Sequence, residues 1–199
     1  FHSPYGCSKG AADQYVRDYA RVYGIPAVVF RQSCIYGYRQ FGLEDQGWVA
    51  WFVIAAMLGR PITVYGDGHQ VRDVLFIEDL VRCYDQAIAN EDAVSSRIFN
   101  VGGGPGNAVS LRAVLEHIRE RLAPELDVTY ADWREGDQAV YVSNVEQAAR
   151  ELAWRPQVGW EDGVDRLIEW AQRERTMLER LFPARPVEAR KAQAQDVAG

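Results

Sequence analysis

The stretch "SPYGCSKGAADQYVRDYARVYGIPAVVFR", residues 3–31, predicts a helix that leads directly into a buried strand. Ser3 is a favourable N-cap and Pro4 a favourable first helical residue, and apolar or aromatic residues then recur at helical spacing. Gly24 ends this helix. The apolar run Ala27–Arg31 is typical of a strand buried in a parallel sheet. A helix joined to such a strand is the repeating unit of α/β proteins.

The rest of the chain continues the alternation of helices and strands and then changes character. In the first half of the chain we expect a buried helix at 48–58, two strands joined by a glycine turn within 62–77, a helix at 78–90 and a strand at 97–101. In the second half we expect a helix capped by Ser110, strands at 127–131 and 138–142, and helices at 144–152 and 161–182. This order predicts an α/β fold in which the end of a parallel sheet carries a smaller α+β domain. The polar tail, 184–199, is expected to be disordered.

The composition narrows the classes of partner. Hydrophobic residues make up 48% of the 199 residues and charged residues 25%, as in an ordinary globular domain. The net charge of −6 argues against binding to nucleic acid or to an anionic membrane. The most apolar run, 48–58, is too short to span a bilayer. Cys7, Cys34 and Cys83 lack metal-ligand spacing, so we expect reduced thiols, a cytoplasmic protein and no metal site.

Tyr5 and Lys9 lie four residues apart on the expected helix. This spacing puts both side chains on one face, with Cβ atoms roughly 5–6 Å apart. A nearby ammonium favours phenolate over phenol, which makes Tyr5 a candidate general base toward a sugar or alcohol hydroxyl. The same spacing also occurs by chance on many helix surfaces. Small residues at Gly6, Ser8 and Gly10 leave the first turns open to a large ligand, which favours the functional interpretation.

An ordered set of longer motifs resembles the extended short-chain dehydrogenase/reductase family, also called the NAD-dependent epimerase/dehydratase family. The resemblance rests on "SPYGCSKGAADQYVRDYARVYGIPAVVFRQSCIYGYRQFG" (3–42), "ITVYGDGHQVRDVLFIEDL" (62–80), "FNVGGGPGNAVSL" (99–111) and "REGDQAVYVSN" (134–144). Within that family, "YGCSKGAADQYVRDYAR", "YGYRQFG" and "EDQGWVAWF" look most like the CDP-paratose 2-epimerases, or CDP-tyvelose epimerases.

The resemblance implies a fold in two parts. One part is the C-terminal portion of a Rossmann-type doubly wound parallel sheet that binds NAD, approximately residues 1–35 and 71–101. The other is a smaller α+β domain that binds a nucleotide-diphosphate sugar, approximately residues 36–70 and 102–183. Family members commonly dimerise through the helix that carries Y-x-x-x-K, so a homo-oligomer is a further expectation.

The resemblance also implies roles for individual residues. Tyr5 would take a proton from a sugar hydroxyl while a hydride passes to NAD, and Lys9 would hold the nicotinamide ribose. The resulting 2-keto sugar would then rotate in the site, so that the hydride would return to the opposite face of the sugar. Gln32 and Ser33 would lie beside the nicotinamide and contact it. The implied substrate-binding residues are Cys34, Arg39 and Gln40 near the sugar, Thr63 and Tyr65 near the base, Arg72 on the diphosphate, and Arg134 near the ribose or phosphate.

The glycine fingerprint of dinucleotide-binding folds is missing from this sequence. No segment matches G-x-G-x-x-G in a turn between a strand and a helix, and the family's catalytic Ser/Thr would precede Tyr5. We therefore expect the first half of the cofactor domain to lie upstream and this chain alone to be inactive. Two alternatives stay open: a nucleotide-sugar 4-epimerase or 4,6-dehydratase of the same family, and a truncated non-catalytic remnant with an interaction or regulatory role.

Overall fold

The computed structural model describes residues 3–183, and the tail predicted to be disordered lies outside them. The first helix, α1 (Pro4–Tyr23), forms where the sequence predicts it. The Ser3 hydroxyl accepts a hydrogen bond from the Gly6 amide at 3.0 Å, and Gly24 ends the helix with a left-handed φ of 65°. Both ends of α1 therefore follow from local capping chemistry.

Strands alternate with helices through most of the described chain, which agrees with the α/β expectation. The strands are β1 (Val29–Gln32), β2 (Cys34–Tyr36), β3 (Ile62–Tyr65), β4 (Val71–Phe76), β5 (Ile98–Val101), β6 (Ala108–Ser110), β7 (Val128–Ala131) and β8 (Val140–Tyr141). The helices after α1 are α2 (Trp48–Met57), α3 (Ile77–Ala89), α4 (Glu91–Val94), α5 (Leu111–Arg121), α6 (Glu146–Glu151), α7 (Trp160–Arg173) and α8 (Arg175–Leu181), with a 3-10 turn, η1 (Pro105–Asn107).

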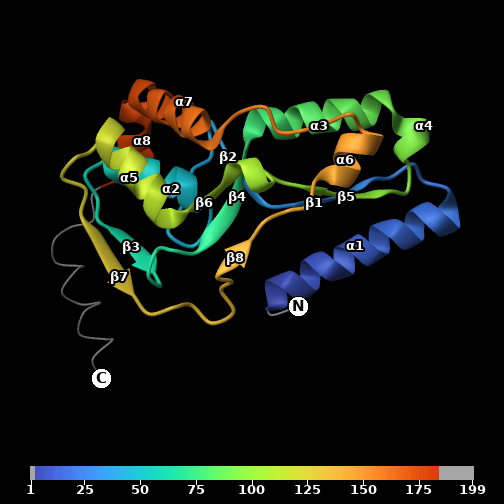
Figure 1. The fold of residues 1–199 in the computed structure, drawn as a ribbon, viewed down its shortest axis with the longest axis horizontal. Coiled ribbons are helices and arrows are strands. Elements are labelled where there is room, and N and C mark those ends of the chain that lie inside the picture. Colours follow the sequence, from blue (N-terminus) through green and yellow to red (C-terminus); the bar gives the residue numbers. More distant parts are fainter. Residues whose placement is uncertain (1–2, 184–199) are drawn as a thin grey trace.

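Parallel pairing dominates the strands. β1 pairs with β5 in parallel, with Val29 opposite Ile98, and β2 pairs with β4 in parallel, with Cys34 opposite Val74. β4 also pairs with β6 in antiparallel and with β8 in parallel orientation. Figure 1 shows α1 and α3 on opposite sides of the β1–β5 pair, which is the layering of a doubly wound sheet.

The two strands on either side of the glycine turn belong to different sheets. β3 pairs with β7 in parallel, whereas β4 pairs with β2, β6 and β8. Gly66 and Gly68 do adopt positive φ values of 92° and 79°. The connection from Tyr65 to Val71 is longer than a tight hairpin, so it redirects the chain instead of folding β4 back onto β3. The expectation of two adjoining strands is right about their positions, but they do not form a hairpin.

Two hydrophobic cores lie side by side. One core collects buried side chains from α2, β3, α5 and α7, among them Phe52, Ile54, Leu115 and Leu167. The other lies around β5 and α3 and includes Phe99, Leu80, Leu152 and Trp154. Residues 145–154 join this second core, although the domain boundaries expected from the sequence group them with the sugar-binding domain. The division into two domains stays a prediction.

Two further expectations differ in detail. The closing helix expected at 161–182 is interrupted at Glu174, which has non-helical dihedral angles, and so forms α7 and α8. The apolar stripe of α1 is largely exposed, with Ala20 its single buried residue. Across residues 3–183, no helix combines the length and the apolar character needed to cross a bilayer.

Candidate active site

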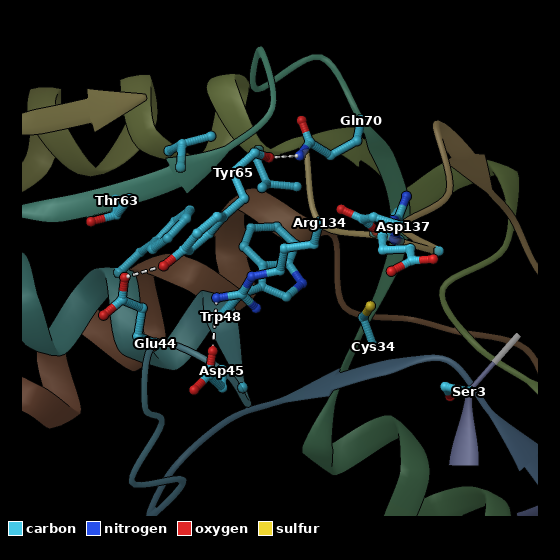
Figure 2. A pocket seen from close by; sticks show the side chains of 17 residues that line it. Ser3, Cys34, Glu44, Asp45, Trp48, Thr63, Tyr65, Gln70, Arg134 and Asp137 are labelled. Atoms are coloured by element: carbon cyan, nitrogen blue, oxygen red, sulfur yellow. Dashed lines mark hydrogen bonds and ion pairs between the residues drawn. The ribbon is translucent and has the colours of Figure 1, made fainter. Parts of the chain in front are cut away.

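A cavity of about 390 Å³ opens between β3, the start of α2, β4 and the loop 134–137. Figure 2 shows its side chains in sequence from Thr63 and Tyr65 at one end, past Arg134 and Trp48, to Cys34 and Ser3 at the other. Most of the predicted substrate-binding residues line this cavity: Cys34, Thr63, Tyr65, Arg72 and Arg134. The fold thus brings together residues that are far apart in the sequence.

The end of the cavity near β3 combines aromatic, cationic and acidic groups. The Arg134 guanidinium lies 3.8 Å from the centroid of the Tyr65 ring, a close cation–π contact. Arg134 also donates to the Asp45 carboxylate at 2.8 Å, and the Tyr65 hydroxyl donates to Glu44 Oε1 at 3.1 Å. Trp48 and Phe52 pack edge to face with ring centroids 5.4 Å apart and add a broad apolar wall.

The middle of the cavity carries a partly covered ion pair. Arg72 Nη2 lies 2.5 Å from Asp137 Oδ1, with the two side chains 14% and 28% exposed. Arg72 also donates to the Val71 carbonyl at 2.8 Å, which fixes the guanidinium close to β4. A planar guanidinium in this position suits phosphate oxygens, because it can donate two parallel hydrogen bonds.

The far end of the cavity is formed by Cys34 and Ser3. Burial raises the pKa of the Cys34 thiol above its usual value, although the Trp48 side chain and the Arg72 charge act in the opposite direction. Cys34 is therefore a neutral thiol near physiological pH. Ser3 caps α1, so this end of the cavity adjoins the first turn of the helix that carries Tyr5.

Tyr5 and Lys9 form the expected pair, outside the wall of the cavity. Lys9 Nζ lies 5.5 Å from the centroid of the Tyr5 ring, as their spacing on α1 requires. The Tyr5 side chain is 67% exposed, so its ring is open to a ligand. A role of this pair in proton transfer stays a prediction.

Gln32 and Ser33 lie at the carboxyl end of β1, where ligands bind in parallel α/β sheets. The Gln32 amide donates to the Tyr84 hydroxyl on α3. The Ser33 hydroxyl donates to Asp73 Oδ1 at 2.6 Å. The Asp73 carboxylate is fully buried in this network.

Arg39 and Gln40 lie in the loop after β2 and do not line the cavity. Arg39 is exposed and has a left-handed φ of 58°. The Gln40 amide donates to the Ile35 carbonyl at 3.1 Å, and a side chain at Gly47 would press against Gln40. Gln40 therefore holds the loop against the start of α2 in this structure, and its contact with a sugar stays a prediction.

Sequence reasoning missed several residues of the cavity wall. They are Glu44, Asp45, Trp48, Gln70 and Asp137. Asp137 follows closely after the predicted Arg134, and Glu44 and Asp45 stand in the "EDQG" motif, so their positions within motifs were the available signal. Within residues 3–183, no group of three or more His, Cys, Asp or Glu side chains is arranged to hold a metal ion.

Comparisons with known proteins identify the family. The profile of the NAD dependent epimerase/dehydratase family matches residues 1–102. A CDP-paratose 2-epimerase from Salmonella typhi is 43% identical over 175 residues, which cover 85% of this chain and 52% of that protein. A dTDP-glucose 4,6-dehydratase from Neisseria gonorrhoeae is 34% identical over 179 residues, covering 84% of this chain and 50% of that protein.

Solved structures give the same result for the fold. A UDP-glucose 4-epimerase with UDP-glucose from Thermotoga maritima has a TM-score of 0.77 and 28% identity, over 86% of this chain and 54% of that one. MoeE5 in complex with UDP-glucose and NAD has a TM-score of 0.77 and 29% identity, over 87% of this chain and 56% of that one. The Rossmann-type expectation and the expectation of an NAD-dependent family are confirmed.

The chain spans about half the length of the relatives that it matches. The family match nevertheless covers the Tyr5–Lys9 helix, the loop after β2 and all of β4, where the sequence motifs also occur. Sequence identity, family profile and fold agree with one another. The chain belongs to the NAD dependent epimerase/dehydratase family.

Proposed function

We propose that the whole protein containing this chain epimerises a nucleotide-diphosphate sugar, converting CDP-paratose to CDP-tyvelose at C2 through a keto intermediate. The observation that carries the proposal is the single cavity that runs from Tyr65 and Arg134, past Arg72, to the first turn of α1. The aromatic Tyr65 end, the Arg72 guanidinium in the middle and the α1 helix at the far end suit a base, a diphosphate and a sugar in that order. The 43% identity to a CDP-paratose 2-epimerase supports the choice of sugar nucleotide.

The residues present fit one part of an NAD site. Exposed Tyr5 and Lys9 on α1, with Gln32 and Ser33 at the carboxyl end of β1, offer hydroxyl, ammonium and amide groups at the sheet edge where cofactors bind. The sequence supplies no glycine fingerprint for the pyrophosphate. When bound, NAD would accept a hydride from the sugar carbon and return it to the sugar. We propose that these four residues hold its nicotinamide end and that this chain alone binds NAD weakly.

The proton chemistry is assigned to Tyr5. Its hydroxyl would remove the proton from the sugar hydroxyl as the sugar is oxidised, and would return it on reduction. Lys9, on the same face of α1, places its positive charge beside the Tyr5 ring and stabilises the phenolate during this transfer. Cys34, a neutral thiol on the cavity wall, would contact the sugar without taking up charge.

The decisive experiment is an assay of the whole protein with CDP-paratose, with NMR detection of CDP-tyvelose. Conversion without net consumption of NAD is the expected result, because the hydride returns to the sugar. No conversion of CDP-paratose, together with turnover of a UDP- or dTDP-sugar, would contradict the CDP-paratose assignment.

The second candidate is a nucleotide-sugar 4-epimerase or 4,6-dehydratase. It is supported by the 34% identity to a dTDP-glucose 4,6-dehydratase and by the fold shared with a UDP-glucose 4-epimerase. The same Tyr–Lys pair would serve either reaction. Elimination of water from the sugar, seen as a 4-keto-6-deoxy product, would favour the dehydratase.

The proposal also covers the cellular location and the oligomeric state of the whole protein. The whole protein would act in the cytoplasm as a homo-oligomer. The exposed apolar residues of α1, which include Tyr15, Val16 and Tyr19, support assembly through that helix, whereas Asp18 and Arg21 on α1 form an exposed ion pair. Sedimentation of the whole protein with and without Tyr19→Asp would test assembly: a monomer in both cases would contradict it.

A further inference from the structure

We propose that Glu44 makes the cavity select a pyrimidine that carries an exocyclic amine, cytosine, over uracil or thymine. This inference rests on the proposed function, because it takes the Tyr65 end of the cavity as the subsite for the base. Glu44 lies on that end, where its carboxylate accepts a hydrogen bond from the Tyr65 hydroxyl at 3.1 Å.

Two carboxylates, Glu44 and Asp45, lie at this end of the cavity beside one guanidinium, that of Arg134. The Arg134 guanidinium, a strong donor, is engaged with Asp45 at 2.8 Å and stacked on Tyr65. The Tyr65 hydroxyl is engaged with Glu44. The Glu44 carboxylate has further lone pairs on its two oxygens, which can accept additional hydrogen bonds. The Thr63 hydroxyl can donate or accept and so favours neither kind of base.

Gln70 adds an independent acceptor. It lines the same cavity and is only 2% exposed. Its amide nitrogen donates to the Tyr65 carbonyl at 2.6 Å, whereas Oε1 is buried without a hydrogen-bond partner in the part of the chain that the structure describes. A buried acceptor without a partner is costly, and a ligand that donates a hydrogen bond would remove that cost.

The edges of the pyrimidines differ in the group that this site would meet. Cytosine presents an exocyclic amine, a donor, where uracil and thymine present a carbonyl oxygen, an acceptor. A carboxylate accepts from the cytosine amine but faces the carbonyl oxygen of uracil or thymine with like partial charge. Trp48 and Phe52 provide an apolar wall against which any pyrimidine ring can pack, so selection depends on the polar edge.

The test is a calorimetric titration of the whole protein with CDP and with UDP. The wild-type protein is expected to bind CDP at least about tenfold more tightly. Glu44→Gln should reduce this ratio to about threefold or less, because the amide can donate to the uracil carbonyl as well as accept. Glu179→Gln, the same change at an exposed position on α8, should keep the wild-type ratio.

The outcomes separate this inference from the proposed function. Equal affinities for CDP and UDP in the wild-type protein would overturn the role of Glu44 while leaving a nucleotide site in place, as would an unchanged ratio in Glu44→Gln. Failure of both nucleotides to bind the wild-type protein would overturn the base subsite itself. If circular dichroism shows that Glu44→Gln does not fold, Glu44→Ala takes its place. A ratio of CDP to UDP affinity in Glu44→Ala equal to that of the wild type would then overturn the role of Glu44.

Discussion

Asp73 Oδ1 accepts a hydrogen bond from the Ser33 hydroxyl at 2.6 Å, and this contact joins the end of β1 to β4. The other carboxylate oxygen of Asp73 accepts from the Gly104 amide at 3.1 Å. A Cβ atom at Gly102 would lie 2.3 Å from Asp73 Oδ2, so the loop after β5 can approach the carboxylate only with glycine at that position. One buried carboxylate thus holds together the segments that border the proposed cofactor and sugar sites.

Replacing Asp73 with asparagine should destabilise the protein. The amide keeps the shape of the side chain but offers one acceptor oxygen in place of two, so a buried donor loses its partner. We expect the free energy of unfolding to fall by about 2–3 kcal/mol. Urea unfolding followed by circular dichroism would measure it. Asp85→Asn, at an exposed position on α3, is the control, and equal stability of the two variants would contradict this role of Asp73.

Arg72→Lys should weaken nucleotide binding more than it weakens the fold. Lysine keeps the charge but loses the planar fork that binds two phosphate oxygens at once. Affinity for CDP is expected to fall by about tenfold, roughly one charge-assisted hydrogen bond. Calorimetry gives the affinity, and thermal unfolding reports the fold. Arg175→Lys on α8 should bind CDP as the wild-type chain does, and the same affinity in Arg72→Lys would remove Arg72 from the diphosphate site.

Tyr5→Phe in the whole protein should abolish most of the turnover and leave nucleotide binding intact. The phenylalanine fills the same space without the hydroxyl that moves the proton, so kcat should fall by about 100- to 10,000-fold. Steady-state kinetics with CDP-paratose and titration with CDP separate the two effects. Tyr23→Phe, at an exposed position of the same helix, should retain full kcat. A small loss in Tyr5→Phe would assign the proton transfer to another group.

The sequence predicts the elements whose signals are local. Helix α1 is bounded by its own cap and glycine, and α2 by a continuous apolar run, so both are confirmed nearly to the residue. Strand pairing is not local. β3 pairs with β7, more than sixty residues further along, because both strands cover the core built by α2 and α5. No pattern within "ITVYGDGHQVRDV" encodes that partner. The glycine turn between β3 and β4 therefore suggests a pairing of these two strands that the fold does not contain.

In the candidate site, too, the sequence predicts some residues and misses others. Cys34, Tyr65, Arg72 and Arg134 stand in motifs that resemble the family, and the fold brings them to one cavity. Their acidic neighbours lie in loops, where charged residues are usually solvated and follow no periodicity. Pairing of Asp137 with Arg72 depends on the path of the loop 134–137 beside β4, which is set by tertiary packing.

Cys83 should make stability depend on alkaline pH. Burial raises the pKa of its thiol from 9.0 to about 12 in the folded protein. The folded state therefore retains the proton while the unfolded state loses it, so stability is full below pH 9 and falls as pH rises toward 12. Urea unfolding between pH 8 and pH 10.5 should show a steeper decline in the wild-type chain than in Cys83→Ala. Cys7→Ala, at an exposed position, should decline like the wild type; equal slopes for Cys83→Ala and wild type would contradict the prediction.

Asp137→Asn should strengthen nucleotide binding, because Asp137 and a diphosphate compete for the same guanidinium. Asp137 lies 2.5 Å from Arg72 and is only 28% exposed, so its charge is incompletely screened by water. Removing that charge leaves Arg72 available and removes repulsion of the phosphates, so affinity for CDP should rise several-fold. Calorimetry at low and high salt should show the gain shrinking as salt is added.

Asp162→Asn is the matched control, since Asp162 pairs with Arg166 in an exposed ion pair on α7. Its affinity for CDP should equal that of the wild-type chain at both salt concentrations. Weaker binding in Asp137→Asn would reverse the assignment: Asp137 would then act as a positioning residue that orients Arg72 toward the phosphates. The sign of the change therefore decides whether the ion pair opposes the ligand or prepares the site for it.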